Sequence, residues 1–373
     1  MNRSILTKTF SGLGVGLALL GATAKADDHG VADDQGVVYT MDNAAGANHV
    51  LVFQQDKHGA LHGAGSVATG GGGSGGGLSD QNSVILSHDG QWLFVCNAGS
   101  DEISVFSTAD NHLQLVDKVS SGGQMPLSLA LHHNVLYVLN AGGLVGGRDN
   151  ITGFFFVDGQ LVSLPGSTRA LSADNTGPAE VAFTHDGNTL IVTERLTNLI
   201  DTFTVGDDGL AAVHQTFASS GADPFGFSVS RQDRIFVSEA TDSTASSYSV
   251  SDDGGLAVIS ASVPTQQHAA CWLTLTPDEQ HAYTADAGSG TLSGFSVAAD
   301  GSLHLLEPDG VAAVIGNGSH PVDMAPSNDG RFLFSLANGN GTLNAFSIAA
   351  DGSLKSLGTA SGIPASAAGL AAR

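Results

Sequence analysis

The sequence predicts an all-β fold, a seven-bladed β-propeller with four antiparallel strands in each blade. The first observation is an internal repeat with a period of roughly 50 residues, which is typical of propellers and solenoids. The second is that each repeat contains β-branched and aromatic runs bounded by Gly, Asn and Asp, such as "WLFVCN" and "TLIVTE". The third is a set of Asp-Gly pairs at the positions where hairpin turns are expected.

The first 26 residues differ in character from the repeats. Arg3 and Lys8 precede an apolar run from about Phe10 to Ala22, and Ala24-Lys25-Ala26 follows it. This is the pattern of a secretory signal peptide that is cleaved after Ala26. The apolar run is too short and too rich in glycine for a membrane-spanning helix. We therefore expect a periplasmic or secreted protein with no membrane span.

Seven repeats fill residues 27–373, which we expect to form a single propeller domain. In each repeat the second strand ends at a polar residue, at intervals of 43 to 54 residues. These positions are Asn43, Asn97, Asn140, Glu194, Glu239, Asp286 and Asn338. Each repeat supplies one four-stranded blade, and neighbouring blades bury each other's faces.

The two ends of the propeller are expected to meet in blade 1. The first repeat lacks an innermost strand, and the C-terminal segment "IPASAAGLAA" begins with proline as other first strands do. We expect this segment to complete blade 1 and close the ring. The stretch Thr69–Gly77, "TGGGGSGGG", resembles a flexible linker between blades 1 and 2.

Alternate residues of each innermost strand should face the axial channel. The first expected layer is Ser83, Ser128, Glu180, Gly226, Trp272, Asp323 and Ser366. The second expected layer is Ile85, Ala130, Ala182, Ser228, Thr274, Ala325 and Ala368. Glu180, Trp272 and Asp323 stand out because the rest of their layer is small. We expect them to surround a small-molecule ligand at one mouth of the channel.

Other candidate residues come from the loops expected at that mouth. His268 and His320 precede innermost strands, Arg195 follows a second strand, and Arg148 lies in a longer loop between Ala141 and Asn150. In a catalytic interpretation, Glu180, Asp323, His268 or His320 activates water, and Arg195 or Arg148 stabilises an oxyanion. Trp272, Asn97, Asn140 and Arg148 would then bind the ligand.

Two other interpretations of the strand-end residues remain open. Glu194, Glu239 and Asp286, with the strand-end asparagines, could supply oxygen ligands to a hard cation such as Ca²⁺. Alternatively, each strand-end side chain satisfies backbone groups of its own turn. No cofactor is expected apart from such a cation.

Charge and cysteine content exclude some functions. Removal of Arg3, Lys8 and Lys25 with the signal peptide takes the net charge from −23 to −26. Such a surface repels nucleic acid and anionic membranes.

Cys96 and Cys271 fall in blades on nearly opposite sides of the channel, too far apart for a disulfide. We expect two free thiols in a monomeric protein.

The repeat units also resemble a known family. The units "LSHDGQWLFVCNAGSDEISVF" and "LTPDEQHAYTADAGSGTLSGFSVAADGSL" resemble the lactonase-type seven-bladed propellers, and the resemblance covers Val37 to the C-terminus. That family includes bacterial 6-phosphogluconolactonases and fungal carboxymuconate cyclases.

The family's catalytic motifs are replaced in this sequence. Where its active enzymes show G-P-R-H, N-E-L and N-R-G, this chain has Gly177-Pro178-Ala179-Glu180, Glu194-Arg195-Leu196 and Asp286-Ala287-Gly288. No catalytic residue can be carried over. The resemblance implies hydrolysis or isomerisation of a small lactone or sugar-acid derivative. The alternative is a non-catalytic propeller that binds a ligand or partner, with or without a stabilising metal.

Overall fold

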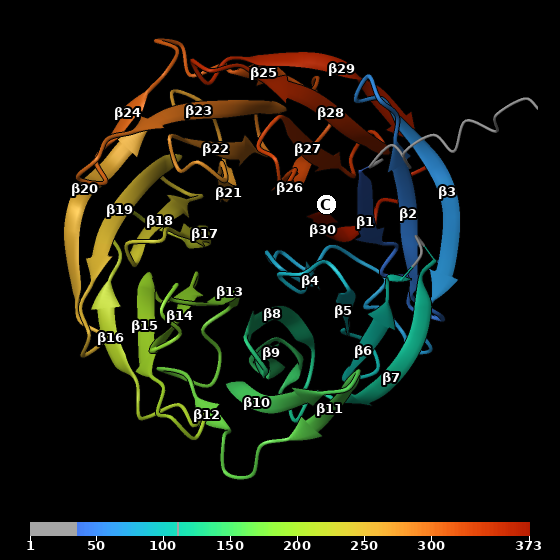
Figure 1. The fold of residues 1–373 in the computed structure, drawn as a ribbon. Coiled ribbons are helices and arrows are strands. Elements are labelled where there is room, and N and C mark those ends of the chain that lie inside the picture. The colour runs from blue at the N-terminus through green and yellow to red at the C-terminus, as the bar shows by residue number, and fades with distance from the viewer. Residues whose placement is uncertain (1–35, 110–111) are drawn as a thin grey trace, which may run out of the picture. The chain divides into compact units, whose positions relative to one another are not determined.

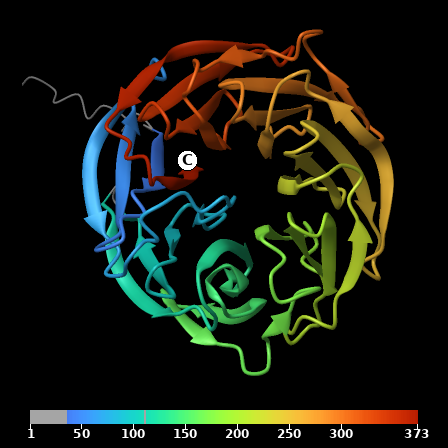
Figure 2. The same ribbon diagram turned by 180° about the vertical axis from the view of Figure 1, so that it is seen from behind.

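The structure is a computed structural model that describes residues 36–109 and 112–373. The expected signal peptide, residues 1–26, lies outside the described residues. Within the described part of the chain, seven antiparallel sheets follow one another around a ring (Figure 1). The same order is seen from behind in Figure 2. The predicted seven-bladed β-propeller is therefore confirmed.

The first three blades use the chain up to residue 170. Blade 1 contains β1 (Val37–Met41), β2 (His49–Gln55), β3 (Leu61–Ala68) and β30 (Ala368–Ala372). Blade 2 contains β4 (Val84–Leu86), β5 (Trp92–Asn97), β6 (Glu102–Ser107) and β7 (Gln114–Ser120). Blade 3 contains β8 (Pro126–His132), β9 (Val135–Ala141), the 3-10 turn η2 (Gly142–Val145), β10 (Asp149–Val157), β11 (Gln160–Ser163) and β12 (Arg169–Ala170).

The other four blades follow the same order. Blade 4 contains β13 (Pro178–Phe183), β14 (Thr189–Glu194), β15 (Leu199–Thr204) and β16 (Gln215–Ala218). Blade 5 contains β17 (Pro224–Val229), β18 (Arg234–Glu239), β19 (Thr244–Val250) and β20 (Leu256–Pro264). Blade 6 contains β21 (Ala270–Leu275), β22 (His281–Asp286), β23 (Thr291–Val297), β24 (Leu303–Leu305) and β25 (Ala313–Val314). Blade 7 contains β26 (Pro321–Pro326), β27 (Phe332–Ala337), β28 (Thr342–Ile348) and β29 (Leu354–Ser361).

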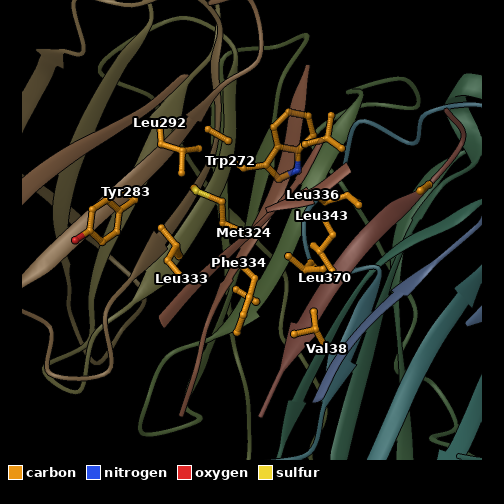
Figure 3. Close-up of a cluster of buried hydrophobic side chains, with 14 of the residues drawn as sticks. Val38, Trp272, Tyr283, Leu292, Met324, Leu333, Phe334, Leu336, Leu343 and Leu370 are labelled. Atoms are coloured by element: carbon orange, nitrogen blue, oxygen red, sulfur yellow. The ribbon is translucent and has the colours of Figure 1, made fainter. Parts of the chain in front are cut away.

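The ring closes through the C-terminal strand, as the sequence predicts. β30 pairs antiparallel with β1 and is the innermost strand of blade 1 (Figure 1). Leu370 of β30 is buried in the cluster that also holds Val38, Trp272 and Phe334 (Figure 3). The last strand therefore joins the first and last blades through both backbone pairing and side-chain packing.

A bulge at the start of most innermost strands directs side chains toward the axis. The register shifts between Pro178 and Glu180, between Ala270 and Trp272, and between Pro321 and Met324. A bulge inserts an extra residue and re-aims the neighbouring side chains. The three conspicuous residues predicted for the first channel layer, Glu180, Trp272 and Asp323, all lie in these bulges.

Candidate functional site

The predicted channel mouth is closed by the chain itself. Residues Ser79–Asn82, here called the axial plug, lie between blade 1 and β4. The amide of Gln81 spans two blades, because its Nε2 donates to the carbonyls of Phe227 (3.0 Å) and Leu273 (2.9 Å). Its Oε1 accepts from Leu273 N at 3.1 Å. Gly226 makes room for this side chain, since a Cβ there would lie 2.0 Å from Gln81 Oε1.

Glu180 binds the plug instead of facing an open channel. Its Oε1 accepts a hydrogen bond from Asn82 Nδ2 at 2.6 Å, and its Oε2 accepts one from Phe227 N at 2.6 Å. The side chain is fully buried. Burial raises its pKa well above the ordinary value, although the Phe227 hydrogen bond opposes this, and the charges of Asp323 and Asp80 raise it further.

Trp272 is also engaged by the plug. Its Nε1 donates to the backbone carbonyl of Asp80 at 2.6 Å. The indole lies 4.8 Å, centroid to centroid, from the ring of Phe225 and is buried in the same cluster as Met324 and Leu336 (Figure 3). The expected stacking surface for a ligand is therefore covered in this structure.

Asp323 is held in a strained conformation. Its φ is +113°, in the region that favours glycine, and strain of this kind is concentrated at functional sites. Oδ1 accepts from Met324 N at 2.8 Å, whereas Oδ2 is buried without a hydrogen-bond partner. Burial raises its pKa well above the ordinary value, and the charge of Asp80 adds to the effect.

Asp80, which sequence reasoning missed, forms a group of three buried carboxyls with the predicted channel residues Glu180 and Asp323. Burial raises its pKa to about 7, and its Oδ2 has no hydrogen-bond partner. The plug lies outside the repeat, so no periodic signal marked Asp80, Gln81 or Asn82 as channel residues. A polar run directly after a glycine-rich stretch was the only available hint.

The glycine-rich stretch is not the flexible linker that its composition suggested. Gly73 N donates to Ala44 O at 2.8 Å, and Gly75 N donates to Asn43 O at 2.9 Å. A Cβ on Gly73 would lie 2.2 Å from the carbonyl carbon of Asn43. Glycine is used here because the two backbones approach closely. We call Thr69–Gly77 the strap, because it fastens the base of the plug to blades 1 and 2.

An open cavity of about 620 Å³ lies on the other side of the plug. It opens on the hairpin face, which is formed by the turns between the first and second strands. Gln81, Asn82 and Glu180 line its inner end, and His88, His185, Arg231 and Glu279 line its outer part. An adjoining cavity of about 330 Å³ adds the wall of blade 3. Both are within the size range of small-molecule sites.

The second predicted channel layer is confirmed for six of its seven positions. The residues of this layer that line the two cavities are Ile85, Ala130, Ala182, Ser228, Thr274 and Ala325. Ala368 instead borders a small pocket of about 60 Å³ at the mouth, together with Asp80, Trp272 and His320. Strand alternation therefore predicts the residues of the channel wall correctly. The two cavities, however, open on the hairpin face, which is opposite to the mouth where the ligand site was predicted.

The predicted metal ligands are not gathered around one point. Each is buried in its own blade: Glu194 accepts from Ser172 N (2.9 Å), Glu239 from Gly221 N (3.1 Å), and Asp286 from Ser293 Oγ (2.7 Å). In the described part of the chain, no three His, Cys, Asp or Glu side chains form a group that could hold a metal ion. These carboxylates are bonded within the scaffold, but these three partners lie on neighbouring strands and loops and not in the turns that the structural interpretation named.

The two predicted ligand-binding asparagines are also bonded within the scaffold. Asn97 Oδ1 accepts from Thr69 Oγ1 at 2.6 Å, and its Nδ2 donates to Ser104 Oγ at 2.8 Å. Asn140 Nδ2 donates to Asn150 Oδ1 at 3.1 Å. Both asparagines are fully buried. They are not exposed to a ligand in this structure.

The remaining predicted residues lie apart from the hairpin-face cavity. Arg195 Nε is 3.0 Å from Asp223 Oδ1, and its guanidinium lies over the ring of Phe225. Arg148 is exposed and pairs with Asp174 at 3.5 Å. His268 and His320 are exposed. His320 borders the small mouth pocket together with Trp272 and Asp80.

The two cysteines are free and buried, as predicted. Burial raises the pKa of the Cys96 thiol well above its ordinary value and that of Cys271 to about 12. Neither thiol is therefore activated as a nucleophile.

Among the described residues, no helix is long and apolar enough to cross a membrane.

The chain belongs to the lactonase family of seven-bladed β-propellers. Residues 32–143, 156–271 and 263–365 match the family described as "Lactonase, 7-bladed beta-propeller". Uncharacterized proteins from Staphylococcus aureus strains USA300 and COL are 53% identical over 45 residues. That stretch is 12% of this chain and 13% of each relative.

Solved structures show the same fold at low sequence identity. A putative 6-phosphogluconolactonase from Bacteroides fragilis has a TM-score of 0.67 and 17% identity, covering 93% of this chain and 100% of that chain. A periplasmic gluconolactonase from Pseudomonas aeruginosa has a TM-score of 0.73 and 17% identity, covering 90% of this chain and 98% of that chain. At this identity the likeness concerns the fold.

Proposed function

We propose that this chain is an exported lactonase-type propeller that hydrolyses or isomerises a small uncharged lactone or sugar-acid derivative in its axial channel. The observation that carries the proposal is Glu180 at the inner end of the 620 Å³ cavity. A carboxyl whose pKa is raised by burial is a candidate for both accepting and donating a proton. Membership of the lactonase family supports the reaction class, and the pattern of residues 1–26 supports export.

In the hydrolytic reaction, water adds to the carbonyl carbon of the lactone while the Glu180 carboxylate takes a proton from it. The bond from the carbonyl carbon to the ring oxygen then breaks, and the proton passes from Glu180 to that oxygen. Among the described residues, Arg231 is the one lysine or arginine that lines the cavity, so it is the cation available to an oxyanion or a product carboxylate.

The charge of the cavity favours an uncharged substrate. Arg231 lies beside Glu279, with Nε and Oε1 4.0 Å apart, so its charge is partly balanced. Glu180 lines the inner end, and Asp80 and Asp323 are close enough for their charges to act on it. A phosphorylated lactone would meet acidic groups without a matching set of basic ones.

The proposal is tested with the mature protein and a panel of aldonolactones, each offered uncharged and, where it exists, as its phosphate ester. We expect hydrolysis above the buffer rate for at least one uncharged member, and a lower kcat/KM for its phosphate ester. Preference for the phosphate ester, or no turnover of any member, would contradict the proposal.

The second candidate is a non-catalytic propeller that binds a ligand of the same class. It is favoured by the hydrogen bonds that occupy both oxygens of Glu180 in this structure. Titration calorimetry with the same panel separates the two functions. Binding without turnover supports this second candidate, and turnover excludes it.

A further inference from the structure

The axial plug makes contacts of the kind that a bound ligand would make. The amide of Gln81 is bonded at both its nitrogen and its oxygen by backbone groups of blades 5 and 6. Asn82 donates to the Glu180 carboxylate, and the Asp80 carbonyl accepts from the Trp272 indole. The plug thus fills a polar site that the innermost strands of three blades provide.

The docked plug also carries local costs, which oppose its hydrogen bonds to the innermost strands, including the backbone bonds from Gln81 N to Ala179 O (3.1 Å) and from Leu129 N to Asn82 O (3.0 Å). Its two ends, Ser79 and Asn82, have φ values of +55° and +69°, which side-chain-bearing residues adopt at a cost. Asp80 Oδ2 and Asp323 Oδ2 are buried without partners. A buried polar atom without a hydrogen bond costs about 1–3 kcal/mol. Undocking relieves these costs by exposing the carboxyls to water.

The surroundings of the plug restrict movement to the plug itself. Leu78, just before it, is buried in the core cluster that also holds Val84 of β4, just after it. The strap is hydrogen-bonded to blades 1 and 2. The four plug residues are therefore bounded on both sides by anchored chain, with left-handed backbone at each end.

We infer that residues Ser79–Asn82 are a removable plug that closes the axial channel at the mouth and undocks to join the hairpin-face cavity to Trp272. Undocking removes the Asn82 hydrogen bond and so frees Glu180 Oε1. The consequence for catalysis rests on the proposed function, but the movement itself is measured without any substrate.

Ionisation of the buried carboxyls is expected to drive undocking. Asp80 of the plug is surrounded by Glu180 from β13, Asp323 from β26, Cys96 from β5 and His320 from the loop before β26. The pKa of Asp80 in the docked state is about 7, above the ordinary value of 3.8. Docking is therefore most favourable when these groups are protonated; for Asp80 it becomes less favourable as the pH rises from about 3.8 to about 7 and changes little above that.

Trp272 is a suitable reporter because the chain has only two tryptophans. A Trp92→Phe background leaves Trp272 as the single emitter, and acrylamide quenching of its fluorescence is measured from pH 5 to pH 9. We expect the quenching constant to rise about twofold or more over this range as the undocked population grows. A quenching constant independent of pH would overturn the proposal.

Two plug variants should act in opposite directions in the same background. Gln81→Ala removes three hydrogen bonds, so quenching should already be high at pH 5. Asp80→Asn removes the charge, so quenching should stay low to pH 9. Gln114→Ala, an exposed glutamine of β7, is the matched control and should behave as the parent. Equal quenching in all four proteins at every pH would show that the plug is a permanent part of the core.

Discussion

Buried carboxyl groups are the most unusual feature of this molecule at the scale of single residues. Asp80, Glu180 and Asp323 are all buried near the axis, and the pKa of each is raised. Desolvation of the charged form is the main cause, and their mutual repulsion adds to it. Proteins seldom bury acids without cationic partners, so this group makes the channel the candidate functional region.

The first prediction concerns Asp80→Asn. A carboxyl whose pKa is 3.8 in the unfolded chain and about 7 in the folded one lowers the free energy of unfolding as pH rises between those values. Above pH 7 the parent protein remains destabilised by the full amount. The variant should therefore melt at least about 2 °C above the parent at pH 8. The difference should shrink as the pH falls toward 4.

The matched control is Asp89→Asn, in the first hairpin of blade 2. The pKa of Asp89 is lowered, mainly by its hydrogen bond with Ser87. Its charge is therefore stabilising above the ordinary pKa, and the control should melt below the parent at pH 8. If Asp80→Asn melts at or below the parent at pH 8, burial of an ionised Asp80 is not costly and this interpretation is wrong.

At the scale of elements, the strap and the bulges together build the channel interior. Bulges in β13, β21 and β26 turn Glu180, Trp272 and Asp323 inward. The strap directly precedes the plug in the chain and so positions the plug next to these three side chains. The strap can pack against Asn43 only because particular positions are glycine, whereas its overall glycine content matters less. Gly73 and Gly76 differ sharply in the space that surrounds them.

The second prediction compares Gly73→Ala with Gly76→Ala. A Cβ on Gly73 would lie 2.2 Å from Asn43 C and 2.3 Å from Asn43 O, so the strap must shift. Overpacking of this kind costs about 1–3 kcal/mol. A Cβ on Gly76 meets nothing within 4 Å. Denaturant unfolding should therefore show a loss of stability for Gly73→Ala and almost none for Gly76→Ala. Equal stabilities would mean that the strap is a passive linker.

At the scale of the whole molecule, the internal repeat allows the fold to be predicted from the sequence. It allows only part of the candidate site to be predicted. Each blade repeats one hydrophobic pattern, so the seven sheets, the closing strand β30 and the wall residues Ala182 and Thr274 follow from alternation. The plug could not be found in this way. Its contacts join Gln81 to Phe227 and Leu273, far away in sequence and outside any period.

The strand-end residues show the same limit. A carboxylate after a second strand is compatible with metal binding, ligand binding or a hydrogen bond inside the blade. Only the positions of nearby hydroxyls and backbone groups decide between these, as Ser293 does for Asp286 and Thr244 for Glu239. These partners belong to neighbouring strands and turns, whose side-chain directions the sequence alone does not specify.

The central claim is that Glu180 carries out proton transfer on an uncharged lactone inside the axial channel. The most direct test compares kcat for the best substrate of the panel in the parent, Glu180→Gln and Glu307→Gln. Loss of general acid–base catalysis typically lowers the rate by about 10²–10⁴-fold. The account predicts a fall of that size for Glu180→Gln and little change for Glu307→Gln, an exposed glutamate between β24 and β25 that does not line the cavity. A Glu180→Gln protein that is folded and turns over substrate at the parental rate would contradict it.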